Sequence, residues 1–369
     1  KTSRFFTKES PGVAGLILVK MMKSVFLSQV IGDNSPIPYL FERIAPILAQ
    51  KFNVTILSNY QHKYFNHRNI NEEYTGPPKS FRRILTRAAI SLKEFDLIHT
   101  TTGQKSNLLM ENLAKLRNRD IVHIHTFRVD ETEETINSIN RKMGAKADYL
   151  TAVSKSTADS INNIIGRKPY VVYNGVNIQK FRPDLSFSDV LLKAKIAKPY
   201  FTFVGSFHKR KRPKMVIKVA EEVPEANFLL FGDGPMRQSL ESSARGQKNV
   251  FVMGKVKKSK LPKIYAHSAG LIFPSVREGC PNVVLEAMAS GTPVVGVKAT
   301  SMPEIVEDGI TGFLVEPDNP ELLAGKTRVL LNEKISAIIG SKARDYAVKH
   351  HSFEVIGRKY SQIYENYID

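Results

Sequence analysis

Short apolar strands alternate with amphipathic helices along almost the whole chain, and no other feature constrains its fold as strongly. We expect strands at residues 24–28, 54–57, 97–100, 121–125, 149–153 and 170–173, with helices such as 39–51 and 106–116 between them. The pattern restarts with strands at 201–204, 228–231, 250–253, 271–273, 293–297 and 312–315. Strands separated by helices pair in parallel and are covered on both faces. The sequence therefore predicts an α/β protein with two parallel sheets.

The length of the chain and the position of its prolines predict two domains. A chain of 369 residues is long enough for two cores of ordinary size. The segment 183–199 has prolines at each end and is the natural linker between domains at 21–182 and 200–351. The last helix, within 352–369, carries apolar residues at helical spacing. Residues 1–20 are basic with one short apolar patch, and we place them outside the fold.

Composition favours an anionic partner and a reducing compartment. The net charge is +19, and most of this excess lies in residues 1–182. Phosphates, anionic lipids and nucleic acids all suit such a charge. The chain has no recognisable nucleic-acid motif and no Trp, which argues against a nucleic-acid-binding module. A single cysteine, Cys280, rules out an internal disulfide, and no apolar run approaches the ~20 residues of a spanning helix. We expect a cytoplasmic protein.

The most informative string for function lies between Arg277 and Val297. Glu278 stands on a loop with Gly279 and Pro281, and Glu286 follows eight positions later inside a short predicted helix. Asn282 is the expected N-cap of this helix, and Gly291 ends it. A loop that enters a helix N-terminus presents unpaired N–H groups, which suit a phosphate. Taken singly, Glu278 fits a solvated loop residue, and Glu286 fits a residue that complements the helix dipole.

The whole string resembles the Glu-x7-Glu signature of the family-4 retaining glycosyltransferases. The similarity extends from about Lys23 to the end of the chain, and the segment from Asn174 to Pro183 resembles the interdomain landmark of that family. The resemblance implies a GT-B fold, in which two Rossmann-like domains face each other across a cleft and the C-terminal helix crosses back to the N-terminal domain. It also implies that Glu278 contacts the transferred sugar and that Glu286 contacts the ribose hydroxyls of the donor.

A run of four cations follows the predicted strand 201–204. By itself, such a run is typical of a solvated loop, but here it resembles the phosphate clamp of the family, with Lys211 six residues after Gly205. Ser206 replaces the arginine that usually follows the glycine, so Arg210 or Arg212 is expected to compensate. With the helix N-terminus after Glu278, these cations would stabilise a departing diphosphate.

Further donor contacts are expected from backbone groups around the same cleft. Gly232 and Val256 follow the second and third strands of the C-terminal domain, where the resemblance places the nucleotide pocket. Arg237 stands where a dinucleotide fingerprint needs a small residue, so a nicotinamide cofactor is not expected. Pro281 has no N–H. The backbone donors that follow Glu278 are therefore expected to be Cys280, Asn282 and Val283.

Two histidines lie one residue apart on a predicted strand. Alternation places His123 and His125 on one face, a spacing that a metal site could use, but no Cys or carboxylate set accompanies them. The resemblance assigns His125 to the donor sugar, beside the other two catalytic candidates, Lys211 and Glu278. No Asp-x-Asp metal motif occurs, so we expect neither a metal nor another cofactor.

Together these features predict a metal-independent retaining hexosyltransferase that takes its sugar from a UDP- or GDP-linked donor. The acceptor would be a hydroxyl of a carbohydrate or of a lipid-linked glycan. The main alternative is a nucleotide-sugar epimerase or hydrolase on the same fold, since a fold alone does not fix the reaction.

A basic amphipathic helix is predicted at residues 80–93, and it is relevant to where in the cell the protein is located. Its apolar stripe either packs on the first domain or lies against a membrane. In the second case Arg82, Arg83 and Arg87 would face anionic lipid. That alternative predicts a peripheral protein at the inner face of the membrane.

Overall fold

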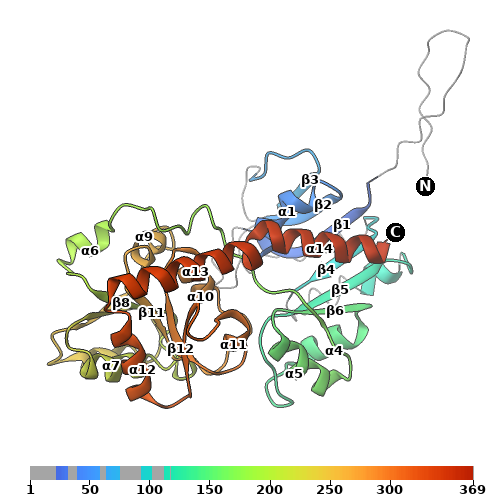
Figure 1. Cartoon of the computed structure of the whole chain (residues 1–369). Helices are drawn as coiled ribbons and strands as arrows, with labels where there is room; N and C mark the ends of the chain where they lie inside the picture. Colours follow the sequence, from blue (N-terminus) through green and yellow to red (C-terminus); the bar gives the residue numbers. More distant parts are fainter. Residues whose placement is uncertain are drawn as a thin grey trace, which may run out of the picture.

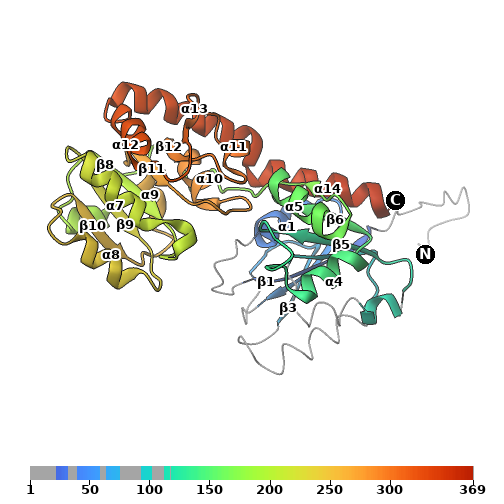
Figure 2. The same ribbon diagram turned by 90° about the horizontal axis from the view of Figure 1, so that it is seen from below.

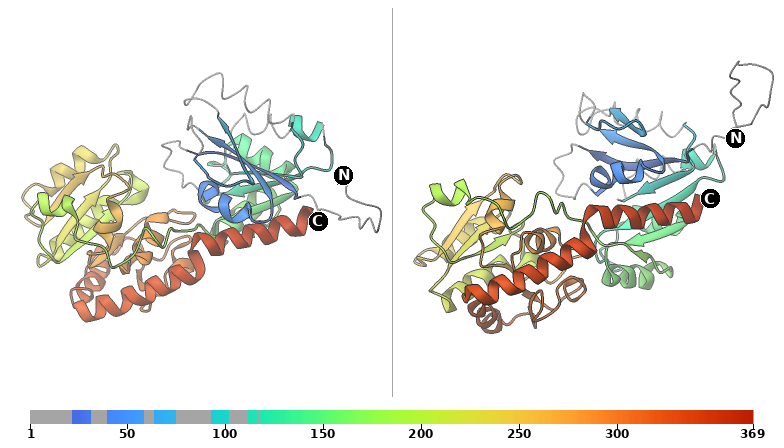
Figure 3. Two further views of the ribbon diagram at one scale, coloured as in Figure 1. Left: turned by 90° about the horizontal axis from the view of Figure 1, so that it is seen from above. Right: turned by 45° about the horizontal axis from the view of Figure 1, so that its top comes forward.

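A computed structural model describes residues 22–31, 40–58, 64–74, 93–101, 112–116 and 118–368 of the chain. These residues form two lobes, each built on one parallel sheet, with a long pair of helices running from one lobe to the other (Figure 1). Both lobes can be recognised as distinct units in Figure 2 and Figure 3. The predicted two-sheet α/β architecture is confirmed.

The first sheet has seven strands in the order β3-β2-β1-β4-β5-β6-β7. Its strands are β1 Ser24–Ile31, β2 Asn53–Ser58, β3 Ile70–Tyr74, β4 Leu97–Thr100, β5 Val122–Phe127, β6 Tyr149–Ala152 and β7 Tyr170–Val171. Its described helices are α1 Leu40–Leu48, α4 Ser138–Lys146 and α5 Lys155–Ile165. The strand β3 was not predicted, because its sequence carries two glutamates. It lies at the edge of the sheet, where polar residues are tolerated.

The second sheet has six strands in the order β10-β9-β8-β11-β12-β13. They are β8 Tyr200–Val204, β9 Asn227–Phe231, β10 Val250–Gly254, β11 Gly270–Phe273, β12 Val294–Val297 and β13 Gly312–Val315. The helices are α6 Asp189–Lys193, the 3₁₀ turn η1 Lys209–Lys211, α7 Pro213–Glu222, α8 Arg237–Ala244, α9 Leu261–Tyr265, α10 Asn282–Ala289, α11 Met302–Ile305, α12 Pro320–Val329, α13 Glu333–His351 and α14 Phe353–Ile368.

Local sequence explains where several helices begin. The side chain of Ser154 accepts a hydrogen bond from the amide of Thr157 at the start of α5, and Asn332 does the same for the amides of Lys334 and Ile335 in α13. The prediction that Asn282 caps α10 is wrong. The helix begins at Asn282 itself, Pro281 takes the cap position without a side-chain bond, and the Asn282 Oδ1 atom is buried without a partner.

The last helix returns to the first lobe, as the resemblance implied. Ile356, Tyr360 and Tyr364 of α14 are fully buried in the core that also contains α1 and the first strands. The chain therefore crosses between the lobes twice, after β7 and between α13 and α14. The two crossings are bonded to each other, because the amide of Val176 donates to the carbonyl of His351 at 2.7 Å. This junction lies beside the site described next.

Candidate functional site

The strand order reverses beside the first strand of each sheet, between β1 and β4 and between β8 and β11. Ligands of such sheets bind at the carboxyl ends of the strands that flank this switch point. In the first sheet, the segments that follow β1 and β4 lie outside the described residues, apart from Thr101. In the second sheet, β8 leads into the turn with Lys211, and β11 leads into the loop with Glu278. Two strands thus bring together two residues that the sequence separates by 67 positions.

Lys211 and Glu278 form an ion pair. The Nζ atom of Lys211 lies 2.5 Å from Oε1 of Glu278, and their side chains are only 12% and 10% exposed. The ring of Phe273 lies 5.2 Å from the same ammonium group. Burial lowers the pKa of Lys211, and the Glu278 carboxylate opposes this shift. The interpretation of Glu278 as a solvated loop residue is therefore wrong, because the carboxylate is largely buried and paired.

Other side chains fix the position of Glu278. The hydroxyl of Ser275 donates to the same Oε1 atom at 2.6 Å, and the amide of Glu278 donates to Thr300 Oγ1 at 3.1 Å. Sequence reasoning missed both residues. No local signal marks Thr300, which comes from the loop after β12 and meets Glu278 only in the folded chain.

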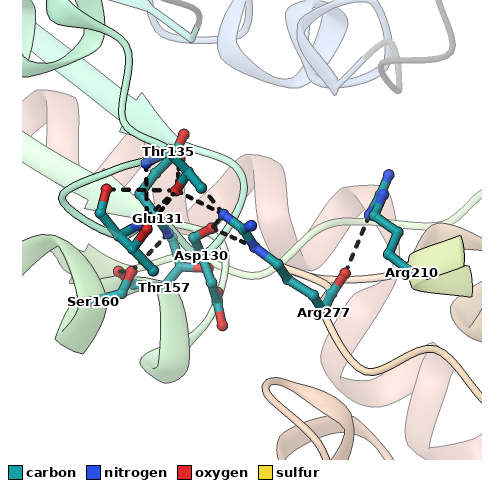
Figure 4. A network of polar contacts seen from close by, with 8 residues as sticks. Asp130, Glu131, Thr135, Thr157, Ser160, Arg210 and Arg277 are labelled. Atoms are coloured by element: carbon teal, nitrogen blue, oxygen red, sulfur yellow. Dashed lines mark hydrogen bonds and ion pairs between the residues drawn. The ribbon is translucent and has the colours of Figure 1, made fainter.

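The remaining cations of the run differ in what they contact. Arg210 is half exposed, lies 3.5 Å from Oε1 of Glu278, and donates to the carbonyl of Arg277 at 3.2 Å (Figure 4). Arg212 points elsewhere, toward Asp318, with a hydrogen bond of 3.0 Å from Nη2. Arg210 is thus the cation that accompanies Lys211. Among the described contacts, none joins the Ser206 side chain to this pair.

Three neighbouring strands of the second sheet end at glycines. Gly205 follows β8, Gly232 follows β9, and Gly254 is the last residue of β10. The amide of Gly232 donates to the carbonyl of Gly254 at 2.9 Å, and a Cβ atom at Gly232 would lie 1.8 Å from the carbonyl oxygen of Gly205. Gly232 also has φ +154°, a conformation that favours glycine. Val256, just after β10, packs against the core that contains α10. Backbone groups after β8, β9 and β10 therefore lie side by side.

The helix α10 brings two features to the candidate site, namely its N-terminus and the side chain of Glu286. The amides of Asn282 and Val283 lie in its first turn, where helix geometry provides no partner within the helix. Glu286 lies in the second half of the helix, so it does not complement the dipole at the N-terminus. Burial raises the pKa of Glu286 to about 7, and the nearby charges of Lys258 and Lys180 oppose the shift.

Cys280 is a packing residue of the loop. It is 5% exposed, and burial raises the pKa of its thiol to about 12, so the thiol is not ionised at neutral pH. The side-chain amide of Asn174 donates to the Cys280 carbonyl at 2.7 Å, and the amide N–H of Asn174 donates to Sγ at 3.4 Å. The interdomain landmark and the glutamate loop are therefore in direct contact.

The two predicted histidines do share one face of β5. Nε2 of His123 and Nδ1 of His125 lie 2.8 Å and 2.7 Å from the hydroxyl oxygen of Thr100. His125 has no exposed surface, and burial with the neighbouring His123 lowers its pKa to about 3, so it is neutral. No described contact joins His125 to Lys211 or Glu278.

A third histidine, which the sequence did not single out, lies on the opposite face of the first sheet. His99 is bonded through Nδ1 to the hydroxyl of Tyr364 and through Nε2 to that of Thr126, both at 2.6 Å. Burial holds the pKa of His99 well below its usual value. It connects the sheet to α14, so its role is to anchor the returning helix.

The glutamate loop touches the first lobe directly. Arg277 donates from Nε and Nη2 to the carbonyl of Asp130, at 3.2 Å and 2.7 Å, and from Nη2 to the hydroxyl of Thr135 at 2.8 Å (Figure 4). Glu304 of α11 accepts the amides of Lys155 and Ser156 at the start of α5. The carboxyl ends of β5 and β11 therefore face each other across the interface between the lobes.

Two classes of site receive no support from the described residues. No group of three or more His, Cys, Asp or Glu side chains in this part of the chain could hold a metal ion. No helix of the described ranges is long and apolar enough to cross a membrane. Arg82, Arg83 and Arg87 lie outside the described residues.

Comparisons with known proteins agree with this geometry. The family described as Glycosyl transferases group 1 matches residues 198–333, and Glycosyltransferase Family 4 matches residues 46–180. A sulfoquinovosyl transferase of Arabidopsis thaliana is 33% identical over 48% of this chain and 36% of its own length, so the chain matches about a third of that relative. An uncharacterized glycosyltransferase of Methanocaldococcus jannaschii is 24% identical over 96% of this chain and 100% of its own length.

A solved structure shares the fold over almost the whole chain. The HepE protein of Anabaena, in a crystal structure with UDP and glucose, superposes with a TM-score of 0.74 over 93% of this chain and 100% of its own, at 19% identity. That identity shows the fold alone. With the two family matches and the two facing sheets, it follows that this chain belongs to the family-4, group 1 glycosyltransferases and has the GT-B fold.

Proposed function

We propose that the protein transfers a hexosyl unit from a nucleoside-diphosphate sugar to an acceptor hydroxyl, with retention of anomeric configuration and without a metal ion. One observation carries the proposal. The Lys211–Glu278 pair lies at the switch point of the second sheet, between Arg210 and the start of α10. It combines a cation for a leaving phosphate with a carboxylate for a sugar, within one small site.

Donor binding would exchange the partners of this ion pair. Without a ligand, the Lys211 ammonium group neutralises Glu278. A diphosphate would attract Lys211, Arg210 and the amides of Asn282 and Val283, because cations and a helix N-terminus all favour negative charge. Glu278 would then be free to accept hydrogen bonds from sugar hydroxyls, and Ser275 would hold it in place.

The same groups would stabilise the transition state. Negative charge develops on the departing diphosphate as the glycosidic bond breaks, and preorganised cations and N–H donors at that position lower the barrier. Glu286 would accept the ribose hydroxyls as a carboxylate, whose two oxygens can each accept a hydrogen bond. His125, neutral and buried, would act only as a hydrogen-bonding group, not as a charged acid.

The relatives support the class of donor. The solved structure of HepE contains UDP and glucose, and the Arabidopsis relative is a sulfoquinovosyl transferase. We therefore favour a UDP-linked sugar, with a GDP-linked sugar as the alternative. The acceptor would be a carbohydrate or a lipid-linked glycan.

The decisive experiment uses purified protein, UDP- and GDP-hexoses, and a panel of acceptors, in excess chelator. Proton NMR of the product should show the anomeric configuration of the donor, and transfer should continue without added metal. An inverted product would contradict the retaining mechanism. Restoration of lost activity by Mg²⁺ or Mn²⁺ would contradict metal independence. Conversion of the donor sugar to its epimer without an acceptor would instead favour the epimerase alternative.

We also propose a peripheral location at the inner face of the membrane, supported by the net charge of +19 and by the basic run around residues 82–87. The protein should co-sediment with anionic vesicles at low salt, and less so after Arg82, Arg83 and Arg87 are changed to Gln. Equal sedimentation of both proteins would exclude this segment as the contact.

A further inference from the structure

A buried polar chain leads from the first lobe into the glutamate loop. Arg128, directly after β5, donates from Nη2 to Oδ1 of Asn174 at 3.0 Å. Asn174, on the crossing after β7, is 5% exposed and donates from Nδ2 to the carbonyl of Cys280 at 2.7 Å. Cys280 lies two residues after Glu278 and two before α10. The chain therefore ends at the segment that holds both the sugar carboxylate and the phosphate-facing amides.

Asn174 also belongs to the hinge between the lobes. Nδ1 of His351, at the end of α13, lies 3.2 Å from the Asn174 carbonyl, and burial lowers the pKa of this histidine to about 4. Because a neutral imidazole can carry its hydrogen on Nδ1, this contact is a donation from His351 to Asn174. Both crossings of the chain therefore meet at the residue that holds the loop.

The glutamate loop packs closely against the first lobe at Gly279. A Cβ atom at Gly279 would lie 2.2 Å from the carbonyl oxygen of Arg128 and 2.9 Å from Cγ2 of Val153. Only glycine permits this approach, so the loop backbone lies directly on the residue that begins the polar chain. A movement of Arg128 relative to the second lobe would therefore displace Gly279 and Cys280 together.

The charge of Arg128 adds to the strength of this connection. Burial lowers the pKa of the guanidinium, and Nη1 is buried without a partner in the described part of the chain. No carboxylate among the described residues forms an ion pair with it. A buried cation with few partners holds the hydrogen bonds that it does make, because losing one leaves charge unpaired. Among the described contacts, its hydrogen bond to Asn174 is the side-chain contact that connects it to the loop.

From these contacts we infer that Arg128 and Asn174 are positioning residues that couple the hinge between the lobes to the placement of Glu278. When the lobes sit as in this structure, the Asn174 amide fixes Cys280 and thereby keeps Glu278 between Ser275 and Lys211. The inference rests on the proposed function for its consequence in catalysis. The coupling itself rests on the contacts and can be measured without any activity.

The single cysteine supplies that measurement. Because Cys280 is the only cysteine of the chain and is bonded to Asn174 through both its thiol and its carbonyl, the rate of thiol modification reports how firmly the loop is held. The test uses the full chain and a small thiol reagent under native conditions. Asn174→Asp keeps an oxygen for Arg128 but places a second acceptor against the Cys280 carbonyl. It therefore removes the side-chain bond to the loop, while the bond to Arg128 and the backbone bond to the Cys280 thiol remain.

A neighbouring residue gives a matched control. Tyr173 also bonds across the interface, from its hydroxyl to Oε2 of Glu304 at 2.9 Å, but this bond does not reach the loop. We expect Asn174→Asp and Arg128→Lys to raise the labelling rate of Cys280 about tenfold or more, and Tyr173→Phe to change it less than twofold. Circular dichroism and thermal unfolding, measured in parallel, separate loop release from global unfolding.

Activity provides the second measurement. Asn174→Asp should lower kcat by about 10- to 100-fold, because a displacement of about 1 Å at a reacting group has effects of this size. The donor KM should change less than kcat does, since Glu286 lies farther along the helix and would keep its contact with the ribose. Tyr173→Phe should keep kcat within twofold.

The outcomes separate the two proposals. Unchanged labelling of Cys280 in Asn174→Asp and Arg128→Lys, with intact folding, would overturn the coupling. So would an equal increase in Tyr173→Phe. Faster labelling in a protein that transfers no sugar from any donor would instead support the coupling and count against the proposed function.

Discussion

The two sheets carry different kinds of titratable side chains at the carboxyl ends of their strands: a charged pair in one sheet and buried histidines in the other. In the second lobe, the strands that flank the switch point bring an ammonium group and a carboxylate to a site that is 10–12% exposed. In the first lobe, β4 and β5 carry His99, His123 and His125, which are almost fully buried among threonines and tyrosines. The first arrangement is an ion pair whose members could each form a new contact with a bound ligand. The second holds imidazole rings that are hydrogen-bonded to neighbouring strands and to α14, and burial lowers the pKa of two of them, His99 and His125.

This difference follows from burial, not from residue type. A lysine and a glutamate that are largely but not completely buried can stay ionised as a pair, because each opposite charge favours the charged form of the other. An imidazole without solvent loses its proton, because desolvation disfavours the charged form. Polar residues at the carboxyl ends of parallel strands can therefore serve either function or stability, and exposure decides between the two.

The largest expected effect is on the charged site. Lys211→Met keeps the length of the side chain but removes the cation, so we expect kcat to fall by about 10²- to 10³-fold. The matched control is Arg212→Gln, since Arg212 belongs to the same basic run but is paired with Asp318. It should keep kcat within about threefold. Equal losses in both variants, measured per folded protein, would show that the whole basic run acts as a diffuse charge.

The buried histidines should make the protein sensitive to acid. Burial lowers the pKa of His99 well below its usual value and that of His125 and His351 to about 3 and about 4. Between about pH 6.5 and 4 the unfolded chain binds protons at these groups and the folded chain does not. Each histidine therefore lowers the free energy of unfolding by about 1.4 kcal/mol per pH unit as the pH falls.

Glu286 acts in the opposite direction in part of that range. Its folded pKa of about 7 lies above the usual value, so between about pH 7 and 4.5 the folded state binds the extra proton and is stabilised by acid. Three histidines lower the free energy of unfolding in acid and one glutamate raises it, so the expected net loss of this free energy is about that of two histidines. Urea unfolding at pH 7, 6 and 5 measures the slope, and His99→Gln should reduce it by about one proton. An unchanged slope in that variant would mean that His99 titrates normally.

The donor site should show its own pH dependence. Because the carboxyl group of Glu286 has a pKa of about 7, it is half protonated at neutral pH, and a ribose would bind better to its ionised form. The donor KM should fall between pH 6 and 8 in the native protein. Glu286→Gln should abolish this trend and raise KM about tenfold at pH 8, the value of about one charge-assisted hydrogen bond. A parallel pH trend in the variant would exclude Glu286 as its origin.

The smallest effect on turnover is expected in the first lobe. His125→Gln removes a neutral ring bonded to Thr100, so it should lower the free energy of unfolding by about 1–3 kcal/mol through an unsatisfied buried group. Its kcat should fall no more than about tenfold. A loss of kcat as large as that of Lys211→Met, with stability unchanged, would instead make His125 a residue that contacts the substrate.

Sequence periodicity was a reliable guide wherever a strand is buried on both faces. The strands β4 and β13 have the predicted bounds, and the other predicted strands lie within three residues of theirs at either end. The exception is β3, whose polar edge gives no apolar run. The start of α10 was also misplaced, since Asn282 has the composition of a cap but lies inside the helix.

The periodicity of the sequence predicted the two sheets, and its resemblance to a family of known motifs implied the returning helix and the candidates Lys211, Glu278 and Glu286. Only the tertiary structure decided which of them meet. Ser275 and Thr300 reach Glu278, and Asn174 reaches Cys280, because parallel strands distant in sequence end at one edge. Burial, which no local pattern encodes, then shielded the ion pair of Lys211 and Glu278 and kept His99 and His125 of the first sheet neutral.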